Sequence, residues 1–197
     1  MQDPSFDRLA TPRLVVRRFA AADAGALAAY RSEPEVARYQ AWECPYALAE
    51  ATRFIASLEG LAPGTPGTWF QFAVELAATG DLVGDVALRT SRSDPRQGEI
   101  GFTVASARQR RGFAREAVTA VVDYAFGRLA MHRVFSITDA RNLGAQRLLE
   151  RLGFRRELDF RDSTWFKGEW AREVLYARLA SEHRPGAGRS SSPSAGR

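Results

Sequence analysis

The stretch ASARQRRGFAREAV, residues 105–118, gathers arginines around a single glycine, Gly112, at the expected start of a helix. The preceding segment, GEIGFTVA (98–105), alternates apolar with polar or small residues, which predicts a strand. The apolar residues that follow recur at helical intervals from 112 to 129. A helix that starts there presents free N–H groups and the positive end of its dipole. The turn at 109–115 is therefore expected to bind an anion.

Gly112 lets the backbone adopt a positive φ and lets a ligand approach the main chain without meeting a Cβ atom. Ala114 keeps the next position small, and Arg110 and Arg111 could add positive charge to a pyrophosphate held by backbone amides. The alternative is that Gly112 only begins a helix and that the arginines are solvated. The segment matches neither the G-x-G-x-x-G dinucleotide motif nor the P-loop motif, so the sequence supports neither of these nucleotide sites.

The segments on either side predict a mixed α/β domain. Strands are expected at 12–19, 69–76, 82–90, 98–105, 133–139 and 173–179, with one more strand between the last helix and 173–179. Helices are expected at 21–39, where Pro34 interrupts the pattern, and at 45–60, 112–129 and 142–154. The strands at 69–76 and 82–90 are expected to pair as an antiparallel hairpin. Because strands and helices do not alternate regularly, a doubly wound Rossmann sheet fits poorly.

The composition is that of a globular protein: of 197 residues, 45% are hydrophobic and 26% are charged. We expect one domain over residues 1–183, followed by a flexible tail of Gly, Pro, Ser, Ala and Arg at 184–197. No apolar run approaches the roughly 18 residues of a membrane span, and the N-terminus lacks the pattern of a signal peptide. The sequence therefore predicts a cytoplasmic protein without a membrane partner.

The net charge of +5 at first suggests a nucleic-acid partner. The tail carries three arginines, however, and the rest of the chain has 25 basic against 23 acidic residues. No dense basic stripe with interleaved aromatic residues is present, so the sequence disfavours nucleic-acid binding. Cys44 is the only cysteine and the chain has only two histidines, His132 and His183. We therefore expect no internal disulfide and no Cys/His metal site.

The six residues from Gln109 to Ala114 resemble the Q/R-x-x-G-x-G/A signature with which the GNAT N-acetyltransferase superfamily binds acetyl-CoA. Four further segments occur in the order typical of its RimJ/RimL-like branch: TPRLVVRRF (11–19), GEIGFTV (98–104), DARNLGAQRLLERLGFRRE (139–157) and WFKGEWAREVLYARL (165–179). The resemblance spans residues 8–180. It implies a mostly antiparallel central sheet with splayed central strands, flanked by helices. It also implies transfer of an acetyl group from acetyl-CoA to a primary amine in a ternary complex, with coenzyme A as product.

By the same resemblance, the pantetheine arm of the cofactor lies in the gap between the splayed strands. The residues implied in cofactor binding are Phe102, Thr103 and Val104 along the pantetheine, Gln109, Arg110, Arg111, Gly112, Phe113, Ala114 and Arg115 around the pyrophosphate, and Asn142 near the thioester. Asn142 is also suited to cap the helix that follows it, and the two roles are compatible.

Glu99 is the candidate general base, directly or through a water, because it faces away from Ile100 on its strand and a comparable glutamate recurs in relatives. The alternative is a solvent-facing glutamate on a half-exposed strand, and Asp85 is the second choice as base. A backbone N–H near Val104 is expected to contact the oxyanion. Relatives often place a Ser or Tyr where this chain has Ala145. Water or another hydroxyl then protonates the thiolate here, or the thiolate leaves unprotonated.

The acceptor is expected to lie among aromatic and acidic side chains. The candidates are Tyr39, Trp42, Glu43, Asp85 and Trp165, and for each aromatic the alternative is packing in the core or a loop. The resemblance implies a protein N-terminal α-amine as acceptor, and a small-molecule amine such as an antibiotic or an amino acid is the alternative. A non-catalytic acyl-CoA-binding or nucleic-acid-binding module is the alternative of another class. Cys44 is not expected to act as a nucleophile, and the sequence leaves open a monomer or a homodimer.

Overall fold

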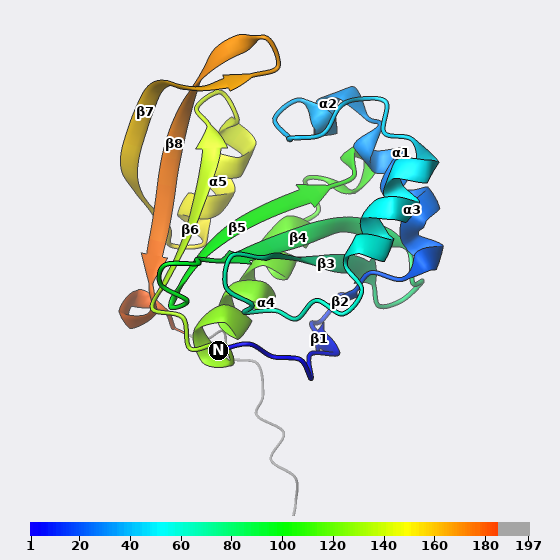
Figure 1. Cartoon of the computed structure of the whole chain (residues 1–197), viewed down its shortest axis with the longest axis horizontal. Helices are drawn as coiled ribbons and strands as arrows, with labels where there is room; N and C mark the ends of the chain where they lie inside the picture. The colour runs from blue at the N-terminus through cyan, green and yellow to red at the C-terminus, as the bar shows by residue number, and fades with distance from the viewer. Residues whose placement is uncertain (185–197) are drawn as a thin grey trace, which may run out of the picture.

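The computed structural model describes residues 1–184. Within them the chain forms eight strands and five α-helices (Figure 1), in the order β1 (Arg8–Ala10), β2 (Leu14–Arg18), α1 (Ala24–Arg31), α2 (Pro34–Ala37), α3 (Leu48–Ser57), β3 (Trp69–Leu76), β4 (Leu82–Thr90), β5 (Gln97–Val104), α4 (Phe113–Gly127), β6 (Arg133–Asp139), α5 (Leu143–Arg151), β7 (Arg155–Phe166) and β8 (Glu169–Leu179). The tail expected at 184–197 lies, apart from Arg184, outside the described residues.

The strands form one sheet in the order β1-β2-β3-β4-β5-β6-β8-β7. In the part of the chain that the structure describes, β5 and β6 are parallel and every other neighbouring pair is antiparallel. This confirms the predicted mixed and mostly antiparallel sheet. Figure 1 shows α1, α2 and α3 grouped on one side of the molecule and the long β7–β8 hairpin on the other.

Alternate residues of the central strands fill the main core on one face of the sheet. Phe72 of β3 and Ile100 of β5 are fully buried, in the same apolar cluster as Val121 of α4 and Leu149 of α5. Every second side chain of these strands is therefore buried in this core, as the alternation in the sequence predicted. The helices α4 and α5 cover this face, whereas α1 and α3 pack together over the opposite face around a smaller apolar cluster.

The structure divides one predicted helix and adds one strand. The helix expected at 21–39 is split into α1 and α2, because Pro34 lacks an N–H donor and begins the second helix. The strand β1 has only three residues, which is too short to show an alternating pattern. The hairpin expected at 69–90 is confirmed as β3 and β4.

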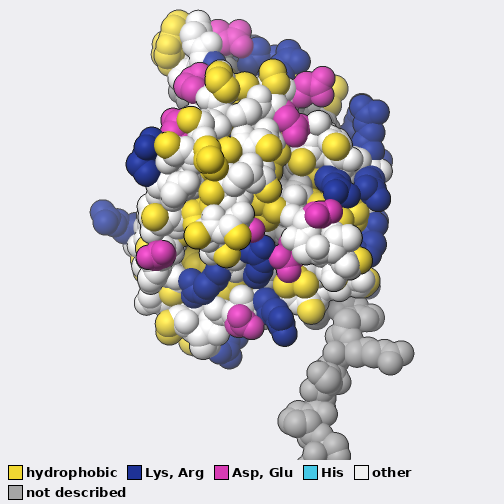
Figure 2. Space-filling view, turned by 90° about the vertical axis from the view of Figure 1, so that its right-hand side faces the viewer, with side chains coloured by type: hydrophobic (Ala, Val, Ile, Leu, Met, Phe, Trp, Pro, Cys, Tyr) yellow, Lys and Arg dark blue, Asp and Glu magenta, His cyan; other side chains and the backbone are white. Residues whose placement is uncertain are grey.

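The surface over α1–α3 carries charges of both signs. Figure 2 shows basic and acidic side chains interspersed with apolar ones on this face, where no continuous basic stripe is visible. No helix within residues 1–184 combines the length and the apolar character that crossing a bilayer requires.

Candidate active site

The two central strands separate after three residue pairs. β5 and β6 are paired only from Gln97 to Glu99 on β5 and from Arg133 to Phe135 on β6, although both strands continue for several residues. Beyond Glu99 this edge of β5 has no strand partner among the described residues, so its backbone N–H and C=O groups face the gap. An extended ligand can pair with such an edge as a neighbouring strand would.

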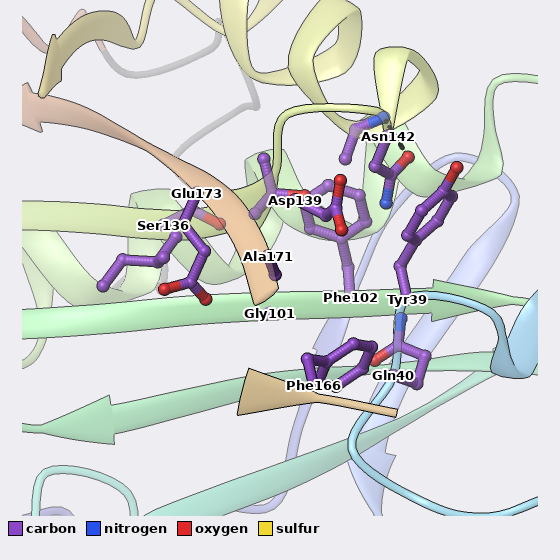
Figure 3. Close-up of a pocket in the computed structure, with 13 residues that line it drawn as sticks. Tyr39, Gln40, Gly101, Phe102, Ser136, Asp139, Asn142, Phe166, Ala171 and Glu173 are labelled. Atoms are coloured by element: carbon purple, nitrogen blue, oxygen red, sulfur yellow. Dashed lines mark hydrogen bonds between the residues drawn. The ribbon is translucent and has the colours of Figure 1, made fainter. Parts of the chain in front are cut away.

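A cavity of about 140 Å³ lies at this gap (Figure 3). Its walls come from β5, β6, the start of α5, the β7–β8 hairpin and the segment that follows α2. The lining residues are Tyr39, Gln40, Gly101, Phe102, Ser136, Ile137, Thr138, Asp139, Asn142, Ala145, Phe166, Ala171 and Glu173. Four separate parts of the chain, at 39–40, 101–102, 136–145 and 166–173, therefore meet where the central strands part.

The turn between β5 and α4 has the geometry of an anion site. Gly112 is the N-cap of α4 and has a φ of 82°, and Arg110 also has a positive φ, 59°. The first hydrogen bond of the helix runs from the Glu116 N–H to the Gly112 carbonyl. The N–H groups of Phe113, Ala114 and Arg115 therefore have no intrahelical acceptor, and the positive end of the helix dipole lies at the same place.

Arg13, just before β2, braces this turn from a distant part of the chain. Its Nη1 donates to the Arg111 carbonyl at 2.9 Å and its Nε to Glu116 Oε2 at 2.7 Å. A Cβ atom at Gly112 would lie 3.2 Å from Arg13 Nη2, so the close approach of this guanidinium adds to the requirement for glycine. Gln109 holds the other side of the turn, because its Nε2 donates to the Val104 carbonyl at 2.9 Å.

The three β5 residues expected along the pantetheine differ in their exposure. Phe102 lines the cavity, Thr103 is buried opposite Asp85, and Val104 is half-buried and accepts the Gln109 hydrogen bond. The structure therefore places Phe102 in the cavity wall. Thr103 and Val104 instead present their backbone groups at the end of β5 that is not paired with β6.

Asn142 caps α5 and also lines the cavity. Its Oδ1 accepts the Ala145 N–H at 3.1 Å, so the capping role considered from the sequence is present. The amide nitrogen of its side chain forms no hydrogen bond within residues 1–184. Ala145 lies in the same wall, and the cavity hydroxyls of Tyr39, Ser136 and Thr138 come from other elements.

Glu99 lies at the point where the strands separate, two residues before Gly101 of the cavity wall, and is not itself among the lining residues. Arg89, its neighbour across β4 and β5, donates to Glu99 Oε2 at 2.6 Å. Burial raises the pKa of Glu99 above its ordinary value, the Arg89 guanidinium opposes this rise, and the negative charge of Glu173 adds to it. A carboxylate with a raised pKa is a better proton acceptor, which suits a general base.

Of the acceptor-side candidates, the structure places Tyr39 in the cavity wall. Its ring rises toward Asn142 in Figure 3, and its hydroxyl is 3.4 Å from the Arg141 carbonyl. Glu43 is exposed outside the lining. Trp165 is 62% exposed and packs edge-on against Trp170 at the tip of the β7–β8 hairpin.

Trp42 and Asp85 belong to a buried network under α1. The Trp42 ring stacks on the Arg31 guanidinium at 4.2 Å, and Arg31 Nη2 is 3.8 Å from Asp85 Oδ2. Tyr30 and Gln71 also donate hydrogen bonds to Asp85. Burial raises the pKa of Asp85, while the Arg31 charge and these two hydrogen bonds oppose the rise. Asp85 therefore serves the packing of α1 against β4 and is absent from the cavity lining.

Sequence reasoning missed six polar or aromatic residues of the lining: Gln40, Ser136, Thr138, Asp139, Phe166 and Glu173. Asp139, Phe166 and Glu173 lie in segments that carry the family resemblance, yet nothing in those segments marks them as site residues. Only the strand register brings the six together. Opposite positions on β6 and β8, such as Asp139 and Glu173, could be found from the sequence only once that pairing is known. Within residues 1–184, no group of three His, Cys, Asp or Glu side chains is arranged to hold a metal ion.

The splayed sheet, the open helix N-terminus beside it and the cavity at the gap are the features expected of an N-acetyltransferase that uses an acyl-CoA donor. Residues 13–155 match the family model of the acetyltransferase (GNAT) domain, which covers well over half of the chain. The chain therefore belongs to the GNAT acetyltransferase family.

Relatives and solved structures agree with this assignment. YoaA of Bacillus subtilis (strain 168), described as an uncharacterised N-acetyltransferase, is 30% identical over 152 residues, which is 77% of this chain and 85% of that protein. Mycobacterium smegmatis RimJ, solved in complex with CoA-disulfide, superposes with a TM-score of 0.80 at 22% identity, over 92% of this chain and 91% of that one. The ribosomal-protein-S5-alanine acetyltransferase of Vibrio fischeri superposes with a TM-score of 0.77 at 20% identity, over 91% and 100%. The two structures show a shared fold.

Proposed function

We propose that this protein transfers an acetyl group from acetyl-CoA to a protein N-terminal α-amine by direct attack in a ternary complex. The observation that carries the proposal is the separation of β5 and β6 directly beside the open N-terminus of α4. An extended thiol arm can pair with the free edge of β5 while its phosphates meet the helix N-terminus. This shape suits coenzyme A, which joins a pyrophosphate to an extended amide chain.

The chain's own residues divide the work of binding and transfer. The N–H groups after Gly112 hold the pyrophosphate, with Arg110, Arg111 and Arg115 adding charge. The Asn142 side-chain amide donates to the cofactor arm while its oxygen caps α5. A backbone N–H near Val104 stabilises the oxyanion.

The preference for an α-amine over a lysine as acceptor follows from the pKa values of free amines in water. At pH 7 roughly one α-amine in ten is neutral, against about one lysine in a few thousand, since their pKa values are about 8 and 10.4. An α-amine therefore needs less help from Glu99, whose charge is already shared with Arg89. The structural likeness to a ribosomal-protein acetyltransferase supports a protein acceptor. A small-molecule amine is the alternative acceptor.

The departing thiolate is protonated without help from position 145, because Ala145 has no hydroxyl. Water or one of the cavity hydroxyls, on Tyr39, Ser136 or Thr138, supplies the proton. A free thiol has a pKa of about 8.5, so departure as the thiolate is also feasible near neutral pH.

Calorimetric titration with acetyl-CoA tests the cofactor site. We expect micromolar binding to the wild type and none to Gly112→Glu, because the new carboxylate would occupy the place of the phosphates. Gly127→Glu is the matched control: it adds the same charge at the far end of α4, where a Cβ atom meets nothing within 4 Å. Equal affinity in all three proteins would refute the phosphate site, and binding of a short DNA duplex in place of acetyl-CoA would indicate a different polyanion.

Intact-mass spectrometry tests the acceptor. Peptides with a free N-terminus should gain one acetyl group in the presence of acetyl-CoA, and the same peptides with a blocked N-terminus should not. Acetylation of polyamines, aminoglycosides or free amino acids, with peptides unchanged, would favour the small-molecule alternative.

A further inference from the structure

Glu173 of β8 is a carboxylate in the cavity wall that forms no ion pair within residues 1–184. Two other carboxylates of the central strands are paired: Glu99 with Arg89 and Asp139 with Arg141, each at 2.6 Å. A half-buried carboxylate without a cation is costly unless something else compensates its charge. Within the cavity, a positively charged ligand is therefore attracted most strongly to the carboxylate of Glu173.

The strand β7 is distorted opposite Glu173 in a way that fixes this carboxylate. Phe160 pairs with Glu173 and Thr164 pairs with Ala171, so three residues of β7 bulge where β8 has one. From this bulge the hydroxyls of Ser163 and Thr164 donate to Glu173 Oε2 at 3.1 and 2.7 Å. Both hydroxyls are neutral, so they orient the group without cancelling its charge. The Oε1 atom keeps its lone pairs for another donor.

Glu173 and Glu99 lie on the same face of the sheet. Glu99 pairs with Phe135, Phe135 pairs with Ala177, and Glu173 is four positions from Ala177 along β8. Figure 3 places Glu173 at the opposite end of the lining from Tyr39. Glu173 lies opposite Asp139, the last residue of β6, so the negative charge that it brings lies along the part of β6 that is not paired with β5, where it attracts a cation.

We propose that Glu173 is the acceptor-recognition residue of this site and that its Oε1 atom binds the ammonium group of a cationic primary amine. The inference rests on the N-acetyltransferase function proposed above and specifies how the second substrate is held. Ser163 and Thr164 are positioning residues, because they act through Glu173.

Binding the ammonium form is distinct from activating the amine. The attacking species is the neutral amine, so a carboxylate that stabilises the ammonium ion strengthens the ground-state complex without stabilising the transition state. Its loss therefore raises KM for the amine and raises kcat in parallel, so that kcat/KM changes little. Above the pKa of the amine the acceptor is neutral in solution, and the difference in KM disappears.

Three variants test the proposal in the full-length protein: Glu173→Gln, the double variant Ser163→Ala/Thr164→Val, and Glu157→Gln as control. Glu157 is on β7 outside the cavity lining and pairs with Arg133. With a peptide amine at pH 7, Glu173→Gln should raise KM about tenfold and the double variant about threefold, with the control unchanged. An aromatic amine, which is uncharged at pH 7, should show the same KM in all four proteins.

Acetyl-CoA titration of each protein separates this inference from the proposed function. If the wild type binds acetyl-CoA and acetylates the peptide, an unchanged KM in Glu173→Gln overturns the role of Glu173. A fall in kcat that recovers with pH also overturns it, because that result identifies a general base. If the wild type acetylates nothing, titration of the peptide against the wild type and Glu173→Gln in the presence of CoA measures ammonium binding directly. Equal affinities there would reject the inference.

Discussion

Arg13 and Glu116 form an ion pair of 2.7 Å that joins the start of β2 to the first turn of α4. Glu116 Oε1 also accepts the Thr11 hydroxyl at 2.7 Å and the Arg13 backbone N–H at 2.8 Å, and Arg13 donates onward to the Arg111 carbonyl. A segment about one hundred residues away in the sequence therefore fixes the turn that is proposed to hold the pyrophosphate.

Glu116→Gln should lower the free energy of unfolding by about 1–2 kcal/mol at pH 7, because several of its hydrogen bonds are charge-assisted. It should also weaken acetyl-CoA binding, since Arg13 loses the partner that holds it against Arg111. Urea denaturation and calorimetry measure the two effects. Arg96→Ala is the control, because the exposed Arg96–Asp94 pair should contribute little. A Glu116 variant as stable as Arg96→Ala would contradict the bracing role.

The contribution of Glu116 should depend on pH. Burial acts to raise the pKa of Glu116, but the hydrogen bonds from Thr11 and Arg13 outweigh it and lower the pKa. A depressed pKa in the folded state gives stability that is present above the unfolded-state pKa and lost as pH falls through the folded-state value. The difference in unfolding free energy between wild type and Glu116→Gln should therefore narrow on acidification below about pH 4.5. A constant difference down to pH 2 would speak against this assignment.

Asn142 allows its capping role to be separated from its cofactor role. Asn142→Ala removes the acceptor for the Ala145 N–H and should cost about 1 kcal/mol of stability as well as acetyl-CoA affinity. Asn142→Asp keeps an acceptor at the helix N-terminus and should retain stability, but it removes the amide donor and should weaken acetyl-CoA binding. Thermal unfolding and calorimetry on both variants measure this. If Asn142→Asp binds acetyl-CoA as the wild type does, Asn142 is only a cap.

Asp85 should contribute to the stability of the fold and not to the binding of the amine acceptor. Asp85→Ala leaves the buried Arg31 guanidinium without its carboxylate and should cost about 3–5 kcal/mol. Asp85→Asn keeps acceptors for Tyr30 and Gln71 and should cost less. Denaturation curves and the KM for a peptide amine distinguish the two roles. A stable Asp85→Asn with a strongly raised KM would support the acceptor role considered from the sequence.

The fold could be predicted from the sequence because local patterns and tertiary burial agree along β3, β4, β5 and α4. Phe70, Phe72 and Val74 alternate in the sequence and are buried together, so period and packing give the same answer. The turn at Gly112 could be predicted for a similar reason. A strand that is followed directly by a helix leaves the first N–H groups of that helix without acceptors.

The cavity could be predicted only in part, because its wall depends on strand register. Glu173 enters the site through pairing with β6 and a bulge in β7, and neither leaves a local pattern. Trp42 and Asp85 have the residue types of an acceptor site, yet both pack against the buried Arg31. Residue type suggests chemistry, but only tertiary contacts decide whether the group faces a cavity or a partner in the core.

Glu99 should show a pH signature that follows from its surroundings. Glu99→Gln should lower kcat about a hundredfold at pH 7, and the loss should shrink as pH rises toward the pKa of the amine, where no base is needed. Because the Arg89 charge opposes the burial-driven rise in the pKa of Glu99, Arg89→Ala should move the acidic limb of the kcat profile to higher pH. Rates from pH 5 to 10 with a peptide acceptor measure both variants, and Glu157→Gln provides the control. A loss in Glu99→Gln that is equal at every pH, together with an unmoved limb in Arg89→Ala, would show that Glu99 is not the base.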